Sequence, residues 1–208
     1  MNSRKGALLY LRTKSTNTSQ KQKKRKRCRY ERKHSLSLLH IDWFEYKGIN
    51  IVAVEDDASR RLLSIGEFNE ATTDNTLKVF NEAESKAKEI NACIYAVNSD
   101  KGTQFYPNKR DKKGNAKHKF EEYLNSRGIK HIPSRRNNPQ TNGKLERWVQ
   151  EYKKHRDRFD SPQEFAKWYN NRLHGALWLE MGETPNEAFQ RKLRPEVLLW
   201  MFFRLNGG

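Results

Sequence analysis

Residues 36–68 read LSLLHIDWFEYKGINIVAVEDDASRRLLSIGEF, and this stretch decides the fold class of the chain. It contains three segments rich in apolar and aromatic residues, at 37–46, 49–54 and 61–68. Turn-forming residues separate them, with Lys47-Gly48 first and the run from Asp56 to Arg60 second. Three consecutive strands with short connections predict an antiparallel meander.

The residues after this meander alternate between helical and strand patterns. Thr72 or Thr73 can cap a helix whose apolar residues recur as far as Ile90. The apolar run at 93–97 is typical of a strand buried on both faces. The next expected elements are a lysine-rich loop at 107–119, a helix at 120–127, a strand at 129–133 and a helix from about Gln140 to Asp157.

Two proline-containing caps predict further helices near the end of the chain. Ser161-Pro162-Gln163-Glu164 and Thr184-Pro185-Asn186-Glu187 both have the capping-box pattern with proline in the first turn. We expect Val197–Phe203 to pack as a terminal helix. This run is far shorter than the ~20 apolar residues that span a bilayer, and the mean hydropathy of −1.08 also argues against an integral membrane protein.

The charge is strongly positive and unevenly distributed. The net charge is +17, of which residues 1–34 carry 13 Lys or Arg against one acid. Residues 35–100 are net acidic and residues 101–144 are again basic. A polyanion, nucleic acid first, is the natural partner, and Lys23, Lys24 and Arg25 are candidate DNA contacts. The alternative for this basic run is a solvated tail without a specific partner.

The two cysteines, Cys28 and Cys93, give neither a disulfide framework nor a zinc-binding spacing. This usage fits a reducing cytoplasm. We expect Cys93 to lie in a core strand.

Three carboxylates stand at positions where sheet and helix can bring them together. Asp42 lies inside the first apolar strand, Asp100 ends the fourth, and Glu146 begins the long helix. An acid in an apolar strand is costly unless something binds it, and hard divalent cations bind carboxylate oxygens. Each acid taken singly is better explained as a hydrogen-bonded structural residue. Together they fit two-metal phosphoryl transfer.

The long helix separates an apolar stripe from a polar face. Leu145, Trp148, Val149 and Tyr152 recur at i, i+3, i+4 and i+7, which predicts the buried side. The other side carries Glu146 beside the cations Arg147, Lys153 and Lys154. A metal needs the carboxylate and a DNA backbone needs the cations, whereas the alternative is an ordinary solvated face.

Several short motifs in order resemble the catalytic core of DDE transposases and retroviral-type integrases, of the kind encoded by prokaryotic insertion sequences. The resemblance covers about residues 30–192. It implies an α/β, RNase H-like fold, with a five-stranded mixed sheet flanked by helices. The matching segments are His40-Ile41-Asp42-Trp43, Ser99-Asp100-Lys101-Gly102-Thr103-Gln104-Phe105, Pro139-Gln140-Thr141-Asn142-Gly143-Lys144-Leu145-Glu146-Arg147, Tyr169-Asn170-Asn171-Arg172-Leu173-His174 and Thr184-Pro185-Asn186-Glu187-Ala188-Phe189.

The resemblance implies that Asp42, Asp100 and Glu146 hold two Mg²⁺ ions, or Mn²⁺ in their place, for DNA strand cleavage and strand transfer. The implied partners are double-stranded DNA and a second subunit, either another copy or a full-length transposase, and the implied place is the cytoplasm, on the nucleoid. We expect no membrane partner. Lys144, Arg147, Lys153 and Lys154 are the expected DNA contacts near the metals.

Two features depart from the family pattern. The interval from Asp100 to Glu146 is longer than in many integrases, and we assign the excess to Asn108–Lys119. Helix-turn-helix modules usually precede such a core, but here we expect a truncated copy or a partner that recognises the DNA ends. The expected domains are a basic, disordered arm at 1–34, the catalytic core at 35–160, and a helical extension at 161–208 that packs on the core.

Several alternatives remain at this stage. An RNase H-type nuclease would share the fold, and a catalytically silent DNA-binding remnant of a transposon would share the charge. The rival acids Glu55, Asp56 and Asp57 fit turn capping or ion pairing better than metal binding. His40 shares the strand face of Asp42, and a role in orienting Asp42 or contacting a phosphate fits it as well as a packed or hydrogen-bonded histidine does. His174 fits a structural role at a helix end, and Asn142-Gly143 fits a mobile loop or a turn before the helix.

Overall fold

The computed structural model describes residues 32–107, 117–134, 139–175, 177 and 182–206, with side chains except at 139–146, 205 and 206. The expected arm at 1–34 therefore lies almost entirely outside the described residues. The same is true of Lys23, Lys24, Arg25, Cys28 and most of the expected Asn108–Lys119 insertion.

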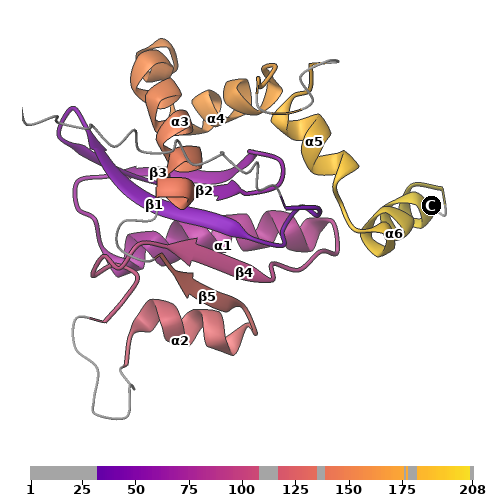
Figure 1. Cartoon of the computed structure of the whole chain (residues 1–208), viewed down its shortest axis with the longest axis horizontal. Coiled ribbons are helices and arrows are strands. Elements are labelled where there is room, and N and C mark those ends of the chain that lie inside the picture. Colours follow the sequence, from indigo (N-terminus) through magenta and orange to yellow (C-terminus); the bar gives the residue numbers. More distant parts are fainter. Residues whose placement is uncertain (1–31, 108–116, 135–138, 176, 178–181, 207–208) are drawn as a thin grey trace, which may run out of the picture. The chain divides into compact units, whose positions relative to one another are not determined.

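A five-stranded mixed sheet organises the described chain, with strand order β3-β2-β1-β4-β5 (Figure 1). Strands β1, β2 and β3 pair antiparallel, as the meander predicts, while β1, β4 and β5 pair parallel. The strand bounds are β1 Leu39–Tyr46, β2 Ile49–Asp56, β3 Leu62–Phe68, β4 Ala96–Ser99 and β5 Lys130–Pro133.

The first hairpin depends on a two-residue turn between β1 and β2. Lys47 and Gly48 both have positive φ, 54° and 77°. A turn with two left-handed residues matches the natural twist of paired strands, and glycine adopts that conformation without strain. Beyond it, β1 and β2 pair over their full length, from Leu39↔Asp56 to Tyr46↔Ile49.

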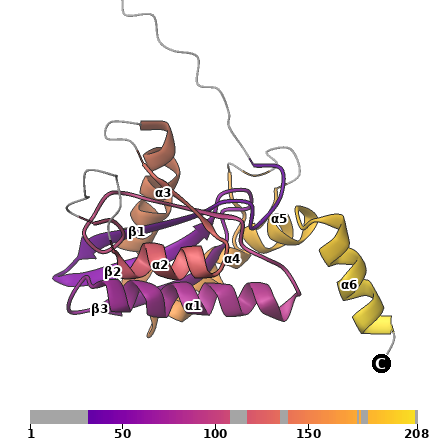
Figure 2. The same cartoon turned by 90° about the horizontal axis from the view of Figure 1, so that it is seen from below.

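Helices cover both faces of the sheet (Figures 1 and 2). On one face, α1 packs against β2 and β3, and α2 packs against β5; on the other, α3 packs against β1 and α4 against β3. The helix bounds are α1 Thr73–Glu89, α2 Lys119–Ser126, α3 Pro139–His155, the 3₁₀ turn η1 Arg156–Arg158, α4 Pro162–Asn171, α5 Pro185–Arg191 and α6 Pro195–Asn206.

The alternation of side chains along the strands creates two separate cores. Leu39 and Ile41 of β1 face the cluster formed with α1 and α2. Phe44, two residues beyond Asp42, instead packs in the cluster that contains Trp148 and Phe165 of α3 and α4. Because residues two apart share a face, Asp42 lies on the α3 side of the sheet.

Several expected element boundaries are wrong. The fourth strand begins at Ala96 rather than at 93, because its ladders to β1 and β5 start at Val97 and Ala96. Cys93 is therefore exposed instead of lying in a core strand, and Tyr95 is 46% exposed. Asp100 follows the strand and is exposed.

The helix caps are confirmed with one change. Thr72 caps α1, and Thr184 with Glu187 forms a complete capping box at α5. At α4, Ser161 accepts a hydrogen bond from the Glu164 N–H, but the Glu164 carboxylate accepts from the Asp160 N–H, one residue before the expected donor.

The apolar tail forms helix α6 as expected, but it packs only in part. Val197 is buried, and Met201 packs against the core of the α1 side. The outer surface exposes Leu198, Leu199, Phe202 and Phe203, the last of these by 68%. Of the helices in the described ranges, none is long and apolar enough to cross a membrane.

Candidate active site

The sheet brings Asp42 and Asp100 together at the point where β1 and β4 separate. The parallel ladder between these strands ends at His40↔Asn98. Asp42 and Asp100 each lie two residues beyond that pair; Asp42 shares the face of His40 in β1, and Asp100 comes directly after the end of β4. The negative charge of Asp100 acts on the Asp42 carboxyl, so the two are electrostatic neighbours. We call Asp42 and Asp100 the carboxylate pair.

Backbone amides hold the two carboxylates in place. Asp42 Oδ1 accepts a hydrogen bond from the N–H of Trp43 at 2.9 Å, and Asp100 Oδ1 accepts one from the N–H of Gly102 at 2.7 Å. A Cβ atom at Gly102 would lie 2.9 Å from Asp100 Oδ1. A larger residue at this position would therefore have to shift the ends of the Asp100 and Gln104 side chains, the latter only 2.7 Å from the added atom.

The carboxylate pair is electrostatically unfavourable without a cation. Burial, reinforced by the charge of Asp100, raises the pKa of Asp42 to about 7, and the hydrogen bond from Trp43 opposes the shift only in part. Burial and the charge of Asp100 both disfavour the ionised form of Asp42, and a nearby positive charge would favour that form. The oxygen-only donor set suits a hard divalent cation such as Mg²⁺.

Helix α3 carries the third predicted acid. The backbone of Glu146 lies in α3, which packs against β1. The predicted apolar stripe is confirmed at Trp148 and Tyr152, which are fully buried and pack edge-to-face on Phe44 at 5.1 and 5.2 Å between ring centroids. The side chain of Glu146 lies outside the described ones. Among the side chains that are described, no three acids, histidines or cysteines form a metal-binding group.

The structure corrects both expectations for Asn142-Gly143. Helix α3 begins at Pro139, so these residues lie within the helix rather than in a loop or turn before it. Proline fits the first helical position, where its missing N–H is not needed. The two turns that follow it carry the chain to Glu146.

A buried hydrogen-bond network surrounds His40 and Asn98, each of which lies two residues before a member of the carboxylate pair. His40 Nδ1 lies 3.2 Å from Asn98 Oδ1, and His40 Nε2 lies 2.7 Å from Asp57 Oδ1. The Asn98 amide also donates to the Ile132 carbonyl, while its oxygen accepts from the Ser134 hydroxyl. Nδ1 must therefore donate to Asn98. Of the two expectations for His40, the hydrogen-bonded histidine is confirmed.

The rival acids Glu55, Asp56 and Asp57, here called the acidic turn, are buried structural residues as expected. Asp56 accepts three hydrogen bonds, from the backbone N–H groups of Leu36 and Ser59 and from the Ser59 hydroxyl. Asp57 pairs with His40 and lies 3.8 Å from an Arg60 nitrogen. Both oxygens of Asp56 and Oδ1 of Asp57 are therefore engaged by protein groups.

The predicted DNA contacts divide into described and undescribed side chains. Arg147, Lys153 and Lys154 are exposed on α3, on the polar side that the sequence predicts. The side chain of Lys144 lies outside those described. Burial lowers the pKa of His174 to about 4, and the positive charges of Arg147, Arg60 and Arg172 add to this shift. Arg147 is therefore an electrostatic neighbour of the buried His174.

His174 has the structural role that the sequence favours. It is 6% exposed and follows the end of α4, and its backbone N–H donates to the carbonyl of Glu183. Its ring packs edge-on against Tyr169 at 6.0 Å between centroids. His174 therefore ties the segment after α4 to Tyr169 of α4 and to Glu183, which precedes α5.

The sequence analysis missed Asn98, Ser134 and the bond between His40 and Asp57. The available signal was periodicity, because Asn98 precedes Asp100 by two residues just as His40 precedes Asp42. The partners themselves come from the sheet order, which places β4 beside β1.

Comparisons with known proteins bear on the fold. No protein-family model matches the chain, and no curated protein matches it. The catalytic core domain of BIV integrase superposes with a TM-score of 0.55 at 17% identity, covering 74% of this chain and 93% of that chain. A chain of the simian T-cell lymphotropic virus intasome superposes with a TM-score of 0.55 at 17% identity, covering 77% of this chain, which spans 56% of that one. With the strand order above, this likeness identifies the fold as RNase H-like.

Proposed function

We propose that the chain catalyses metal-dependent DNA strand cleavage and strand transfer, as a polynucleotidyl transferase of the DDE transposase and integrase type. The observation that carries the proposal is the convergence of Asp42 and Asp100 where β1 and β4 separate, on the face that α3 covers. The RNase H-like fold supports it, because the two similar structures belong to an integrase and an intasome.

Asp42, Asp100 and Glu146 are the proposed metal ligands. The carboxylate pair fits a divalent cation because it is oxygen-only and disfavours its own double ionisation. Bound Mg²⁺ or Mn²⁺ would supply Lewis-acid stabilisation of the phosphoryl charge and would lower the pKa of water. The chain's own part is to fix both aspartates through the amides of Trp43 and Gly102, and to hold the strands beneath them through His40 and Asn98.

Double-stranded DNA is the proposed substrate. Arg147, Lys153 and Lys154 offer exposed cations on the helix that also carries Glu146 and Lys144. We assign the core to residues 35–160, the basic arm to 1–34 and a packed helical extension to 161–208. The net charge of the arm provides further phosphate contacts through Lys23, Lys24 and Arg25. A second subunit and a nucleoid location belong to the same proposal.

DNA cleavage by the purified chain tests this function. We expect nicking of duplex DNA in Mg²⁺ or Mn²⁺ but not in Ca²⁺ or EDTA, and joining of the new 3′ end to a second duplex. Asp42→Asn, Asp100→Asn and Glu146→Gln should each reduce cleavage at least about a thousandfold, because each removes charge that holds a metal. Asp157→Asn is the matched control, since Asp157 is an exposed carboxylate paired with Lys47.

The outcomes separate the alternatives. Cleavage of RNA–DNA hybrids without strand transfer would indicate an RNase H-type nuclease. DNA binding without any cleavage would indicate a silent remnant. Near-normal cleavage by Glu146→Gln would remove Glu146 from the ligand set.

A further inference from the structure

A surface groove of about 470 Å³ opens at the junction of η1 and α4, outside the candidate active site. Aromatic rings and polar groups share its walls. The lining residues are Phe159, Glu164, Lys167, Trp168, Asn171 and Arg172.

Trp168 is the central aromatic residue of this groove. Its ring lies 5.4 Å from that of Phe159 and 4.9 Å from that of His155, measured between centroids. The guanidinium groups of Arg172 and Arg158 lie 5.1 and 5.9 Å from the same ring. Aromatic faces with adjacent cations are the composition that binds unpaired nucleobases, because bases stack on the rings while cations meet the phosphates.

Hydrogen bonds determine which charges remain for a ligand. The Arg172 guanidinium is bonded to Glu151, whereas the Glu164 carboxylate accepts a hydrogen bond from the neutral Asp160 N–H at 3.0 Å and keeps its negative charge. Lys167 is exposed and makes no ion pair within the described part of the chain. Arg158 is also exposed, and its hydrogen-bond partner is His155 at 3.2 Å. Lys167 and Arg158 are therefore the cations that can meet an anion here.

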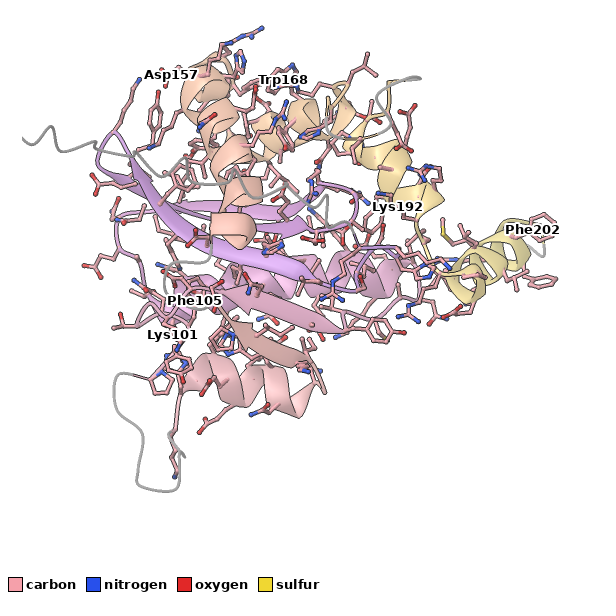
Figure 3. All side chains as sticks on the ribbon, in the orientation of Figure 1. Lys101, Phe105, Asp157, Trp168, Lys192 and Phe202 are labelled. Carbon is pink, nitrogen blue, oxygen red and sulfur yellow. The ribbon has the colours of Figure 1, made fainter. Side chains whose placement is uncertain are left out.

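Helix α3 connects the groove to the candidate active site. Arg147, Lys154 and Arg158 recur at i, i+7 and i+11, close to one side of the helix and its η1 extension. The rise from Arg147 to His155 is about 12 Å. Figure 3 labels Trp168 near the C-terminal end of α3, whereas Lys101, next to Asp100, lies at the opposite side of that view.

We propose that this groove binds an unpaired nucleotide of a DNA strand, with the base stacked on Trp168 and the adjoining phosphates near Lys167 and Arg158. The identity of the ligand as DNA rests on the proposed function. The groove extends that function by giving the chain a preference for duplexes that carry an unpaired strand reaching the C-terminal end of α3, away from the candidate metal site.

Fluorescence anisotropy with the full chain in EDTA tests the groove without any catalysis. The probes are a blunt duplex and the same duplex with a single-stranded thymidine tail, and free dTMP serves as competitor. Trp168→Leu should weaken binding of the tailed probe roughly tenfold, with blunt-duplex binding unchanged. Trp168→Phe keeps an aromatic ring and should retain most of the affinity for the tailed probe. Unchanged binding of the blunt duplex shows that Trp168→Leu is folded.

Trp200→Leu is the matched control, because Trp200 also has a guanidinium, that of Arg204, 5.1 Å from its ring but does not line the groove. It should behave as wild type on both probes. Equal weakening of both probes by Trp168→Leu, or no preference of the wild type for the tail, would overturn the proposal. Displacement by dTMP without a tail preference would assign the groove to free nucleotides instead. If the wild type cleaves DNA in Mg²⁺ but shows no preference for the tailed probe, the groove proposal alone is wrong. If it prefers the tailed probe but does not cleave DNA, the proposed reaction alone is wrong.

Discussion

Two groups of carboxylates lie on adjacent strands of the sheet: the acidic turn at the end of β2, and the carboxylate pair, with Asp42 in the middle of β1 and Asp100 directly after β4. In the acidic turn, Asp56 is fully buried yet accepts three hydrogen bonds from neighbouring groups. In the carboxylate pair, Asp42 receives one backbone hydrogen bond and faces the like charge of Asp100.

The difference lies in what surrounds each carboxylate. Burial raises the pKa of both Asp56 and Asp42, but at Asp56 the donors of Leu36 and Ser59 oppose the shift. A second carboxylate raises both pKa values, but the charge of Asp100 is the second-largest cause at Asp42, whereas that of Asp57 is the smallest at Asp56. Asp56 therefore receives donors that offset its burial, whereas Asp42 receives fewer, which is the pattern expected of a carboxylate that binds a cation.

The largest expected effect is the loss of stability on breaking the acidic turn. Asp56→Ala would leave the buried N–H groups of Leu36 and Ser59 without their acceptor, so we expect the free energy of unfolding to fall by about 3–5 kcal/mol. Urea denaturation measures this change. Asp157→Ala, which removes an exposed carboxylate, should leave the urea midpoint nearly unchanged. A small effect at Asp56 would mean that the acidic turn is not the structural group described above.

The next effect concerns the carboxylate pair, where substitution should stabilise the metal-free protein. The raised pKa of Asp42 means that the folded chain keeps a proton up to pH about 7, which the unfolded chain loses near pH 4. Stability is therefore lost as pH rises from about 4 through 7. Asp42→Asn does not titrate, so in EDTA at pH 8 it should exceed wild type by about 2 kcal/mol, a partial value because the side chain is not fully buried.

Thermal melts at pH 4, 6 and 8 with and without Mg²⁺ check this expectation. Mg²⁺ should stabilise wild type at pH 8, because a ligand of the folded state raises stability, and should not stabilise Asp42→Asn. Asp42→Asn less stable than wild type at pH 8 in EDTA would show that the pair has a cationic protein partner.

The sheet was predictable because its cause is local. Alternation and turn residues in 36–68 predict the three-stranded meander, and Lys47-Gly48 forms the expected turn. The start of β4 was not predictable in the same way. The apolar composition of residues 93–97 favours a strand throughout, but β4 begins only where the chain pairs with β5 and β1, at Ala96 and Val97.

The site followed a similar division. Asp42 and Asp100 could be selected because each interrupts or ends an apolar strand, and the resemblance supplied their order. The role of Asp57 could not be read from the sequence. Its bond to His40 depends on where the turn after β2 returns beside β1, which only the folded sheet determines.

A smaller effect is expected at Gly102, which lets the chain turn closely around Asp100. The added Cβ of Gly102→Ala would lie 2.7 Å from Gln104 Oε1 and 2.9 Å from Asp100 Oδ1, so both side-chain ends would have to shift. Metal affinity should fall roughly tenfold, as for other losses of support around a ligand, while the fold persists. Titration with Mn²⁺, followed by electron paramagnetic resonance, measures the affinity. Gly175→Ala is the control, because it also changes a glycine, has no positive φ, and its added Cβ would meet only an Arg147 nitrogen at 3.6 Å, an ordinary contact distance.

The smallest effect separates two arginines that belong to the two groups of carboxylates. Arg60 is buried and donates to the Asp57 carbonyl at 2.5 Å, so it serves the acidic turn. Arg147 is exposed on α3 directly after Glu146. If DNA lies over the carboxylate pair, Arg147→Gln should weaken duplex binding equally for all sequences and reduce the log–log salt slope by roughly 0.9, the value for one phosphate contact. Arg60→Gln should leave the salt slope unchanged and lower the urea midpoint instead, since it removes a buried hydrogen bond.

Binding titrations at several salt concentrations measure both slopes. An unchanged slope for Arg147→Gln would place the DNA away from the start of α3. The carboxylate pair would then differ from the acidic turn in its hydrogen bonding but not in facing DNA.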